Sequence, residues 1–142
     1  MKSFSIIILA SLVSTNLLSQ SFELGESKYK IENSQKKLGA NLSSGMSQEG
    51  LVFLMDEGSD GMRAWYFDDN EICVACYLKF HSREGRDFIL AMKSMAVKKF
   101  TKVDNLTYCK KESSKYGPDK EYCYIFSVPS PSDLAVLIRP KE

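Results

Sequence analysis

The chain has 142 residues, with 19 basic and 18 acidic residues, and 44% of its residues are hydrophobic. This near-neutral charge argues against nucleic acid as a partner, because binding to phosphates requires a marked excess of Lys and Arg. The length fits one ordinary domain, which can bury its own core without a metal or many disulfides.

The N-terminal segment has the layout of a secretory signal peptide. Lys2 supplies a positive charge, residues 6–13 are an apolar run, and Ser19 and Ser21 place small residues at positions −3 and −1 of a cleavage site. The apolar run is much shorter than the roughly 20 residues of a spanning helix. We therefore expect cleavage rather than stable insertion into a membrane.

Removal of residues 1–21 would leave residues 22–142 as a single domain that is secreted or periplasmic. Lys2 is the only charged residue in the removed segment, so 18 basic residues would face 18 acidic residues. The charges are unevenly distributed, since residues 49–71 are mainly acidic and residues 93–120 mainly basic. Such runs usually form solvated surface, and a dipolar surface that orients a partner is the alternative.

The first half of this domain is predicted to be a helix followed by three strands. Residues 26–38 have helical signals, because Ser27 can cap the N-terminus, basic residues lie near the C-terminus and Gly39 can end the helix. Residues 43–50 are predicted to be a loop. Period-two patterns then predict an antiparallel meander. Its three strands are residues 51–55, 62–67 and 72–80.

The second half repeats this order of elements. Apolar residues at three- and four-residue spacings predict a helix over residues 84–100. Three strands are predicted after it, at residues 106–110, 122–128 and 134–138, with a loop at Gly117-Pro118 and a break at Pro129-Ser130-Pro131. The expected fold is therefore α+β, an antiparallel sheet with two helices packed on one face in the order α-βββ-α-βββ. The repeated order makes an internal duplication a hypothesis.

Four cysteines divide into two pairs. Cys109 and Cys123 face each other if the second hairpin is centred on Tyr116, so we predict a disulfide between them. Cys73 and Cys76 lie three residues apart on a predicted strand, where they would point to opposite faces with Cα atoms about 10 Å apart. That spacing excludes a redox pair in a regular strand, and the wide gap between the later two cysteines disfavours zinc. Cys76 is expected to be a buried apolar residue, and Cys73 has no clear role.

Residues that could carry catalysis are few. His81 is the single histidine, and Ser82 beside it suits a helix cap better than a nucleophile. The acidic turn at residues 56–61 lacks the terminal Glu of a calcium loop, since Phe67 occupies that position. We therefore predict no catalytic residues, no metal ligands and no cofactor.

Tyrosines give the one positive indication of function. Tyr66 and Tyr77 are expected on the second face of the sheet, and Tyr122 and Tyr124 lie in the second hairpin. They either pack in a second core layer or form a face that binds a protein, a glycan or a small apolar ligand. The sequence thus favours a non-catalytic binding domain. A carrier of a small apolar ligand, and an enzyme whose carboxylates and tyrosines converge only in the fold, are the alternatives.

Overall fold

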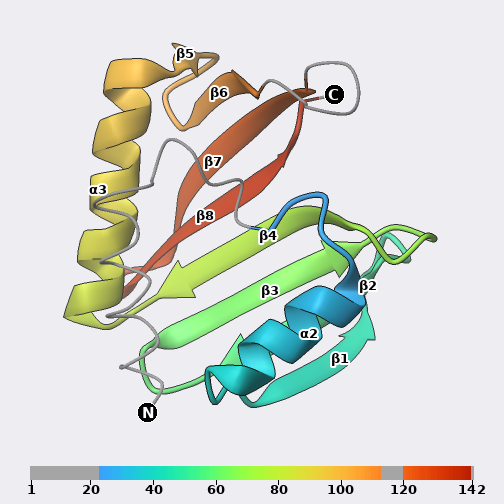
Figure 1. Cartoon of the computed structure of the whole chain (residues 1–142). Coiled ribbons are helices and arrows are strands. Elements are labelled where there is room, and N and C mark those ends of the chain that lie inside the picture. The colour runs from blue at the N-terminus through green and yellow to red at the C-terminus, as the bar shows by residue number, and fades with distance from the viewer. Residues whose placement is uncertain (1–22, 113–119, 142) are drawn as a thin grey trace.

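The computed structural model describes residues 23–112 and 120–141 (Figure 1). These residues form two helices and one antiparallel sheet of eight strands, in the spatial order β1-β2-β3-β4-β8-β7-β6-β5. In chain order the elements are α2 (Lys28–Lys37), β1 (Leu42–Met46), β2 (Val52–Glu57), β3 (Gly61–Phe67), β4 (Cys73–Phe80), α3 (Arg83–Lys99), β5 (Thr101–Lys102), β6 (Thr107–Glu112), β7 (Lys120–Ser130) and β8 (Asp133–Pro140). The predicted α+β class is confirmed. The predicted signal peptide and the loop at Gly117-Pro118 lie outside the described residues.

Serine caps start both helices. The Ser27 hydroxyl accepts a hydrogen bond from the Lys30 amide at 3.3 Å, and the Ser82 hydroxyl accepts one from the Gly85 amide at 3.1 Å. Each cap satisfies an amide that has no partner within its helix. Gly39 follows α2 with a φ of +83°, a conformation that glycine adopts at low cost. Neither described helix is long and apolar enough to cross a membrane.

The prediction of a loop over residues 43–50 is wrong for its first part, because residues 42–46 form β1. This strand pairs with β2, and Gly45 lies opposite Phe53. A Cβ atom at Gly45 would approach the Phe53 ring to 2.7 Å, so the absence of a side chain lets the ring lie over β1. The strand contains one glycine and two serines, which have low strand propensity, so its composition does not predict a strand. Pairing with β2 stabilises it instead.

One face of the sheet contributes to the core. A row of directly paired residues crosses six strands on this face, which we call the core face: Leu54, Trp65, Cys76, Ile138, Tyr124 and Tyr108. All six belong to a single buried cluster, together with Ile31 of α2 and with Phe88 and Met92 of α3. Residues from both helices and from both halves of the sheet therefore share one core.

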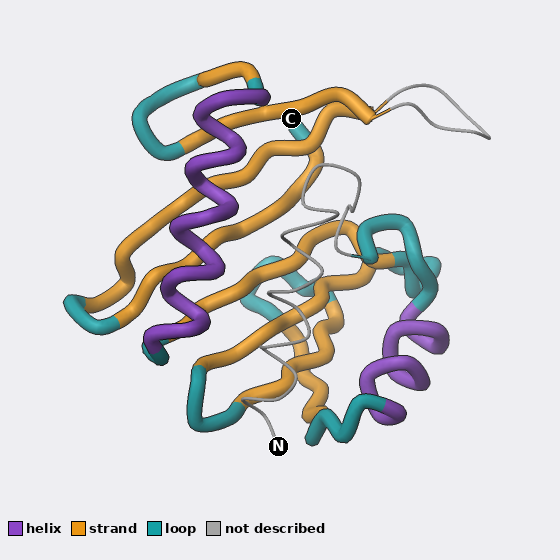
Figure 2. The backbone as a smooth tube through the Cα atoms, turned by 60° about the vertical axis from the view of Figure 1, so that its left-hand side comes forward, coloured by secondary structure: helices purple, strands orange, loops and turns teal. Residues whose placement is uncertain are grey.

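The two halves of the described chain have the same topology. Each consists of a helix followed by four strands, and the halves join where β4 pairs with β8 (Figure 2). The predicted order lacked one strand in each half, β1 and the two-residue β5. β7 continues through Pro129 to Ser130, with a register shift between Ser127 and Ser130, so the first two residues of the predicted break lie in a strand and Pro131 lies in the turn to β8. A repeated topology is the pattern that an internal duplication would leave.

Candidate functional site

The side of the sheet opposite the core face, which we call the second face, carries apolar side chains across both halves. One row contains Met55, Ala64, Tyr77, Leu137 and Ile125. The neighbouring row contains Phe53, Tyr66 and Ala75. Except for Ala64, which is buried between larger neighbours, these residues are partly exposed. None of them belongs to the core cluster found among the described residues.

Aromatic rings form the centre of the second face. The rings of Phe53 and Tyr66 lie 5.9 Å apart between centroids and are tilted by 54°, within the distance at which aromatic rings attract each other. Partial burial raises the pKa of Tyr66, and the charge of Glu49 adds to the shift. Partial burial also raises the pKa of Tyr77, with further contributions from Tyr66 and Asp133. Both phenols therefore stay neutral well above physiological pH, as hydrogen-bonding groups set in an apolar surface.

The four predicted tyrosines do not share a face. Tyr66 and Tyr77 lie on the second face, as expected from the alternation of β3 and β4. Tyr122 and Tyr124 lie on the core face, where only 8% and 1% of their surfaces are exposed. The Tyr124 ring packs 5.1 Å from the Phe100 ring at the end of α3. These two tyrosines belong to the core rather than to an exposed binding surface.

The predicted disulfide is confirmed. Cys109 and Cys123 are directly paired on β6 and β7 and their sulfur atoms are bonded, with 14 residues of sequence separation. Both side chains point to the second face, and both are buried. The bond therefore ties the β6–β7 hairpin together at one end of this face.

The prediction that Cys73 and Cys76 point to opposite faces is wrong. A register shift pairs Phe67 with Cys73 but Tyr66 with Ala75, so Val74 is an extra residue in β4. This β-bulge moves Cys73 onto the core face beside Cys76. Their sulfur atoms lie 3.8 Å apart. The sequence has no simple signal for such a bulge, because the alternating pattern of β4 is equally compatible with a regular strand.

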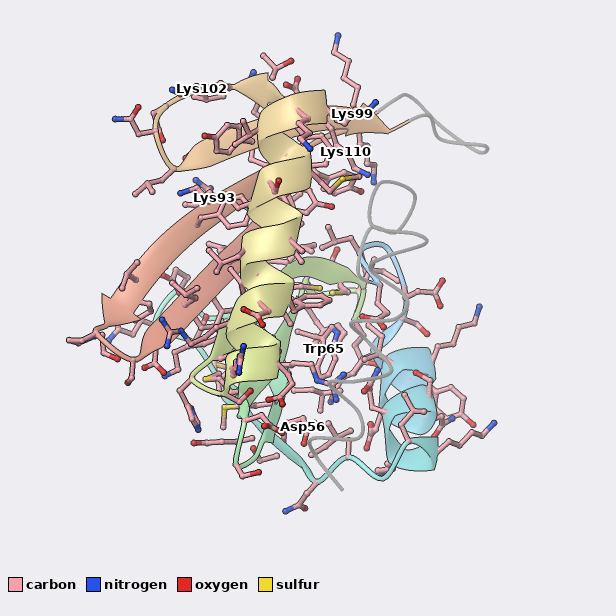
Figure 3. The ribbon with its side chains drawn as sticks, turned by 90° about the vertical axis from the view of Figure 1, so that its left-hand side faces the viewer. Asp56, Trp65, Lys93, Lys99, Lys102 and Lys110 are labelled. Carbon is pink, nitrogen blue, oxygen red and sulfur yellow. A yellow bond between two sulfur atoms is a disulfide. The ribbon has the colours of Figure 1, made fainter. Side chains whose placement is uncertain are left out.

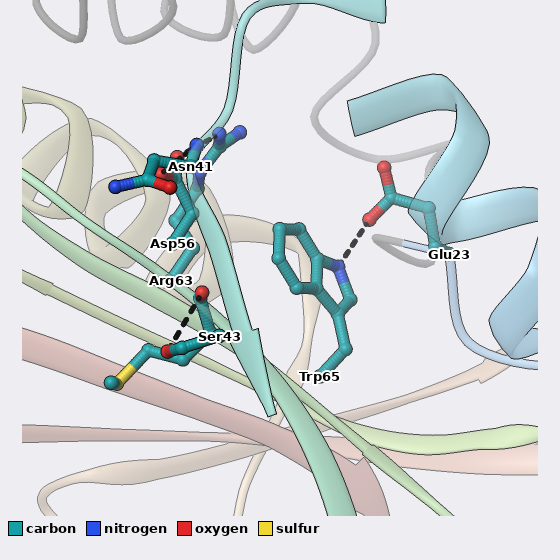
Figure 4. Close-up of polar contacts among 7 residues, drawn as sticks. Glu23, Asn41, Ser43, Asp56, Arg63 and Trp65 are labelled. Atoms are coloured by element: carbon teal, nitrogen blue, oxygen red, sulfur yellow. Dashed lines mark hydrogen bonds and ion pairs between the residues drawn. The ribbon is translucent and has the colours of Figure 1, made fainter. Parts of the chain in front are cut away.

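A polar cluster around the buried residues Asp56 and Arg63 lies on the core face near α2 (Figure 4). Arg63 donates to Asp56 at 2.7 Å, and the backbone N–H of Asn41 donates to the same carboxylate at 3.3 Å. The Arg63 guanidinium also lies 5.4 Å from the centre of the Trp65 ring, whose Nε1 donates to Glu23 at 2.9 Å. Because these groups satisfy one another, we assign the cluster to stability.

His81 has structural contacts at the end of β4. Its Nε2 contacts the carbonyl oxygen of Ser59, and its Nδ1 lies 3.8 Å from Asp133. Its neighbour Ser82 caps α3, as predicted. Among residues 23–112 and 120–141, no three His, Cys, Asp or Glu side chains gather in a way that could hold a metal ion.

Among the depressions that the described residues form, two lie away from the second face. One, of about 230 Å³, is lined by Lys28 at the start of α2, by strand residues and by loop residues that include Asp68 and Glu71. The other, of about 310 Å³, lies on the outside of α3 at Leu90 and Val97. Neither lies between sheet and helix, where a carrier would hold an apolar ligand.

Lysines surround the C-terminal half of α3 (Figure 3): Lys93, Lys99, Lys102 and Lys110.

We compared the chain with protein-family models, with curated proteins and with solved structures. None of the three comparisons found a match.

Proposed function

We propose that this protein is an exported, non-catalytic binding domain that recognises its partner with the second face of the sheet. The observation that carries the proposal is the row of partly exposed apolar side chains through Met55, Tyr77 and Leu137, outside the core cluster. Contiguous apolar surface of this kind usually marks an interaction site, because leaving it in water has a free-energy cost.

The proposal includes the packing of both helices against the core face. Ile31 of α2 and Met92 of α3 share the buried cluster with the core-face residues, which supports this arrangement. A sheet with helices on one side leaves its other side available to a partner. The strands are rigid elements, so the second face would be preorganised and would lose little entropy on binding.

The chemistry of the face favours a partner with both apolar and polar surface. Phe53 and Met55 offer apolar contact, while the hydroxyl groups of Tyr66 and Tyr77 can donate and accept hydrogen bonds. Protein segments and glycans have this mixed character. The apolar body and polar tip of tyrosine make it a frequent residue at interaction surfaces.

Capture of a partner by the full chain, exported by its host cell, tests the proposal. The bait would be compared with Tyr77→Glu, which places a charge in the centre of the face. Val97→Glu is the matched control, because Val97 is 57% exposed on α3, away from the face. We expect Tyr77→Glu to lose the captured partner and Val97→Glu to keep it. Equal capture by both variants would exclude the second face as the binding site.

Two further measurements address the expected export and the alternative carrier function. N-terminal sequencing of the exported protein should begin at Phe22, and an unprocessed N-terminus would contradict the predicted signal peptide. Native mass spectrometry of the same sample should show the mass of the polypeptide alone. An additional small molecule that is lost on denaturation would favour the carrier.

A further inference from the structure

A β-bulge brings two thiols together in the core. Cys73 lies opposite Phe67 and Cys76 lies opposite Trp65, so both side chains emerge on the core face. In a regular strand, residues three apart point to opposite faces with Cα atoms about 10 Å apart. The extra residue, Val74, removes that obstacle, and the sulfur atoms lie 3.8 Å apart. At this distance no other atom fits between the two sulfur atoms, so they could bond without the displacement of another element.

The surroundings hold this pair in place. The Cys73 amide donates to the carbonyl of Glu26 at 2.8 Å, and the Cys73 carbonyl accepts from the Gly25 amide at 2.8 Å. These bonds fix residues 25–26 against the start of β4. Each cysteine is only 2% exposed. Cys73 is therefore positioned by backbone contacts through its N–H and its carbonyl, and both cysteines are shielded from solvent.

We propose that Cys73 and Cys76 form a second disulfide, made by thiol–disulfide exchange with a disulfide compound. The thiolate of one cysteine attacks a sulfur atom of the oxidant and releases one thiol. The thiolate of the other cysteine then attacks the mixed disulfide, forms the Cys73–Cys76 bond and releases the second thiol. The protein loses two protons and two electrons, and the oxidant gains both as its disulfide becomes two thiols. The proposal does not depend on the binding function of the second face.

Burial determines when this reaction takes place. Burial, followed by the hydrogen bond and charge of Cys73, raises the pKa of Cys76 well above its usual value, so the reactive thiolate is disfavoured in the folded protein. An oxidant also has little access to cysteines that are each only 2% exposed. The exchange therefore takes place while the chain is folding and is still open. Cys109–Cys123 is a disulfide of the same protein, so an oxidant able to form that bond is also able to form the second one.

Refolding with glutathione disulfide tests the proposal. The full chain is reduced, unfolded and refolded with glutathione disulfide, then unfolded in acid and alkylated at its thiols. We expect the loss of all four alkylation sites that the reduced chain shows, and peptide mapping should recover Cys73 and Cys76 linked to each other. Alkylation of both Cys73 and Cys76 beside an intact Cys109–Cys123 bond would overturn the proposal. A bond from either residue to Cys109 or Cys123 would overturn it as well.

Two controls keep this result interpretable. The Cys73→Ala variant should show one alkylated thiol, at Cys76, which proves that the assay detects a buried cysteine. Trp65, the only tryptophan of the chain, pairs directly with Cys76 and offers an independent signal. Because a neighbouring disulfide quenches indole fluorescence more than thiols do, reduction should raise the emission of the oxidised protein. The Cys73→Ala/Cys76→Ala variant retains Cys109–Cys123 and should show a much smaller rise; an equal rise would argue against the proposed bond.

Discussion

Arg63 and Asp56 lie opposite each other on β3 and β2 and form an ion pair of 2.7 Å with both side chains less than 10% exposed. Their burial makes the pair sensitive to the loss of one partner, because the remaining charge would stay in a poorly solvated site. The backbone amide of Asn41 donates to Asp56, and the Trp65 ring lies beside the Arg63 guanidinium. The pair therefore joins the start of β1 to the core face.

Asp56→Ala should lower the free energy of unfolding by about 3 kcal/mol or more, since it leaves a buried guanidinium without its carboxylate. Urea unfolding measures this change. The matched control is Lys36→Ala, which breaks a 3.0 Å ion pair with Glu32 on the exposed side of α2 and should cost about 0.5 kcal/mol or less. Similar losses in the two variants would show that Arg63 is solvated.

Gly61→Ala should destabilise the protein more than Gly50→Ala. Both glycines have positive φ, +150° and +87°, so both substitutions strain the backbone. A Cβ at Gly61 would also overlap the carbonyl oxygen of Lys79 and approach Cα of Phe80 to 2.7 Å, whereas nothing lies within 4 Å of one at Gly50. We expect about 1 kcal/mol for the strain alone and at least about 2 kcal/mol with the overlap, by thermal or urea unfolding. An equal loss of unfolding free energy in the two variants would mean that the backbone of β4 shifts away from the added Cβ without destabilising the protein.

Loss of the Cys109–Cys123 bond should destabilise the protein by about 3 kcal/mol, given the 14-residue separation of the two cysteines. The Cys109→Ala/Cys123→Ala variant measures this effect by urea unfolding. Cys73→Ala/Cys76→Ala is the comparison. The loop that a Cys73–Cys76 bond closes is far shorter, so losing that bond should release less entropy in the unfolded chain. A negligible loss in the first variant would indicate that pairing of β6 with β7 alone orders the hairpin.

Stability should fall as pH rises above about 10. Burial raises the pKa of both Tyr66 and Tyr77 in the folded protein. Their neutral forms therefore favour folding, and this contribution is complete below the unfolded-state pKa and disappears as pH passes the higher folded-state pKa.

Tyr66→Phe and Tyr77→Phe should each reduce that alkaline loss. Urea unfolding at several pH values would measure it, and ultraviolet difference spectra would follow ionisation of the phenols. Tyr29→Phe is the control, since Tyr29 is 73% exposed on α2. The idea fails if Tyr29→Phe changes the alkaline loss as much as the two variants on the second face.

Local patterns in the sequence determined much of the fold. Serine caps and apolar periodicity located α2 and α3 because these signals act within a few turns of one helix. Alternation located the meander, and the symmetry of one hairpin about Tyr116 paired Cys109 with Cys123. Each of these features depends on residues close together in the chain, so the sequence alone was sufficient.

Contacts between distant segments decided the rest. Pairing of β4 with β8 joins the two halves, and pairing of β1 with β2 turns a glycine- and serine-rich segment into a strand. Tyr122 and Tyr124 belong to the core because they join a buried cluster of residues distant in the chain, and the ring of Phe100 at the end of α3 packs against Tyr124. Most clearly, one extra residue in β4 reversed the predicted direction of Cys73. Side chains alternate along a strand with a period of two, so a single bulge changes the face of a residue while leaving the composition of the strand unchanged.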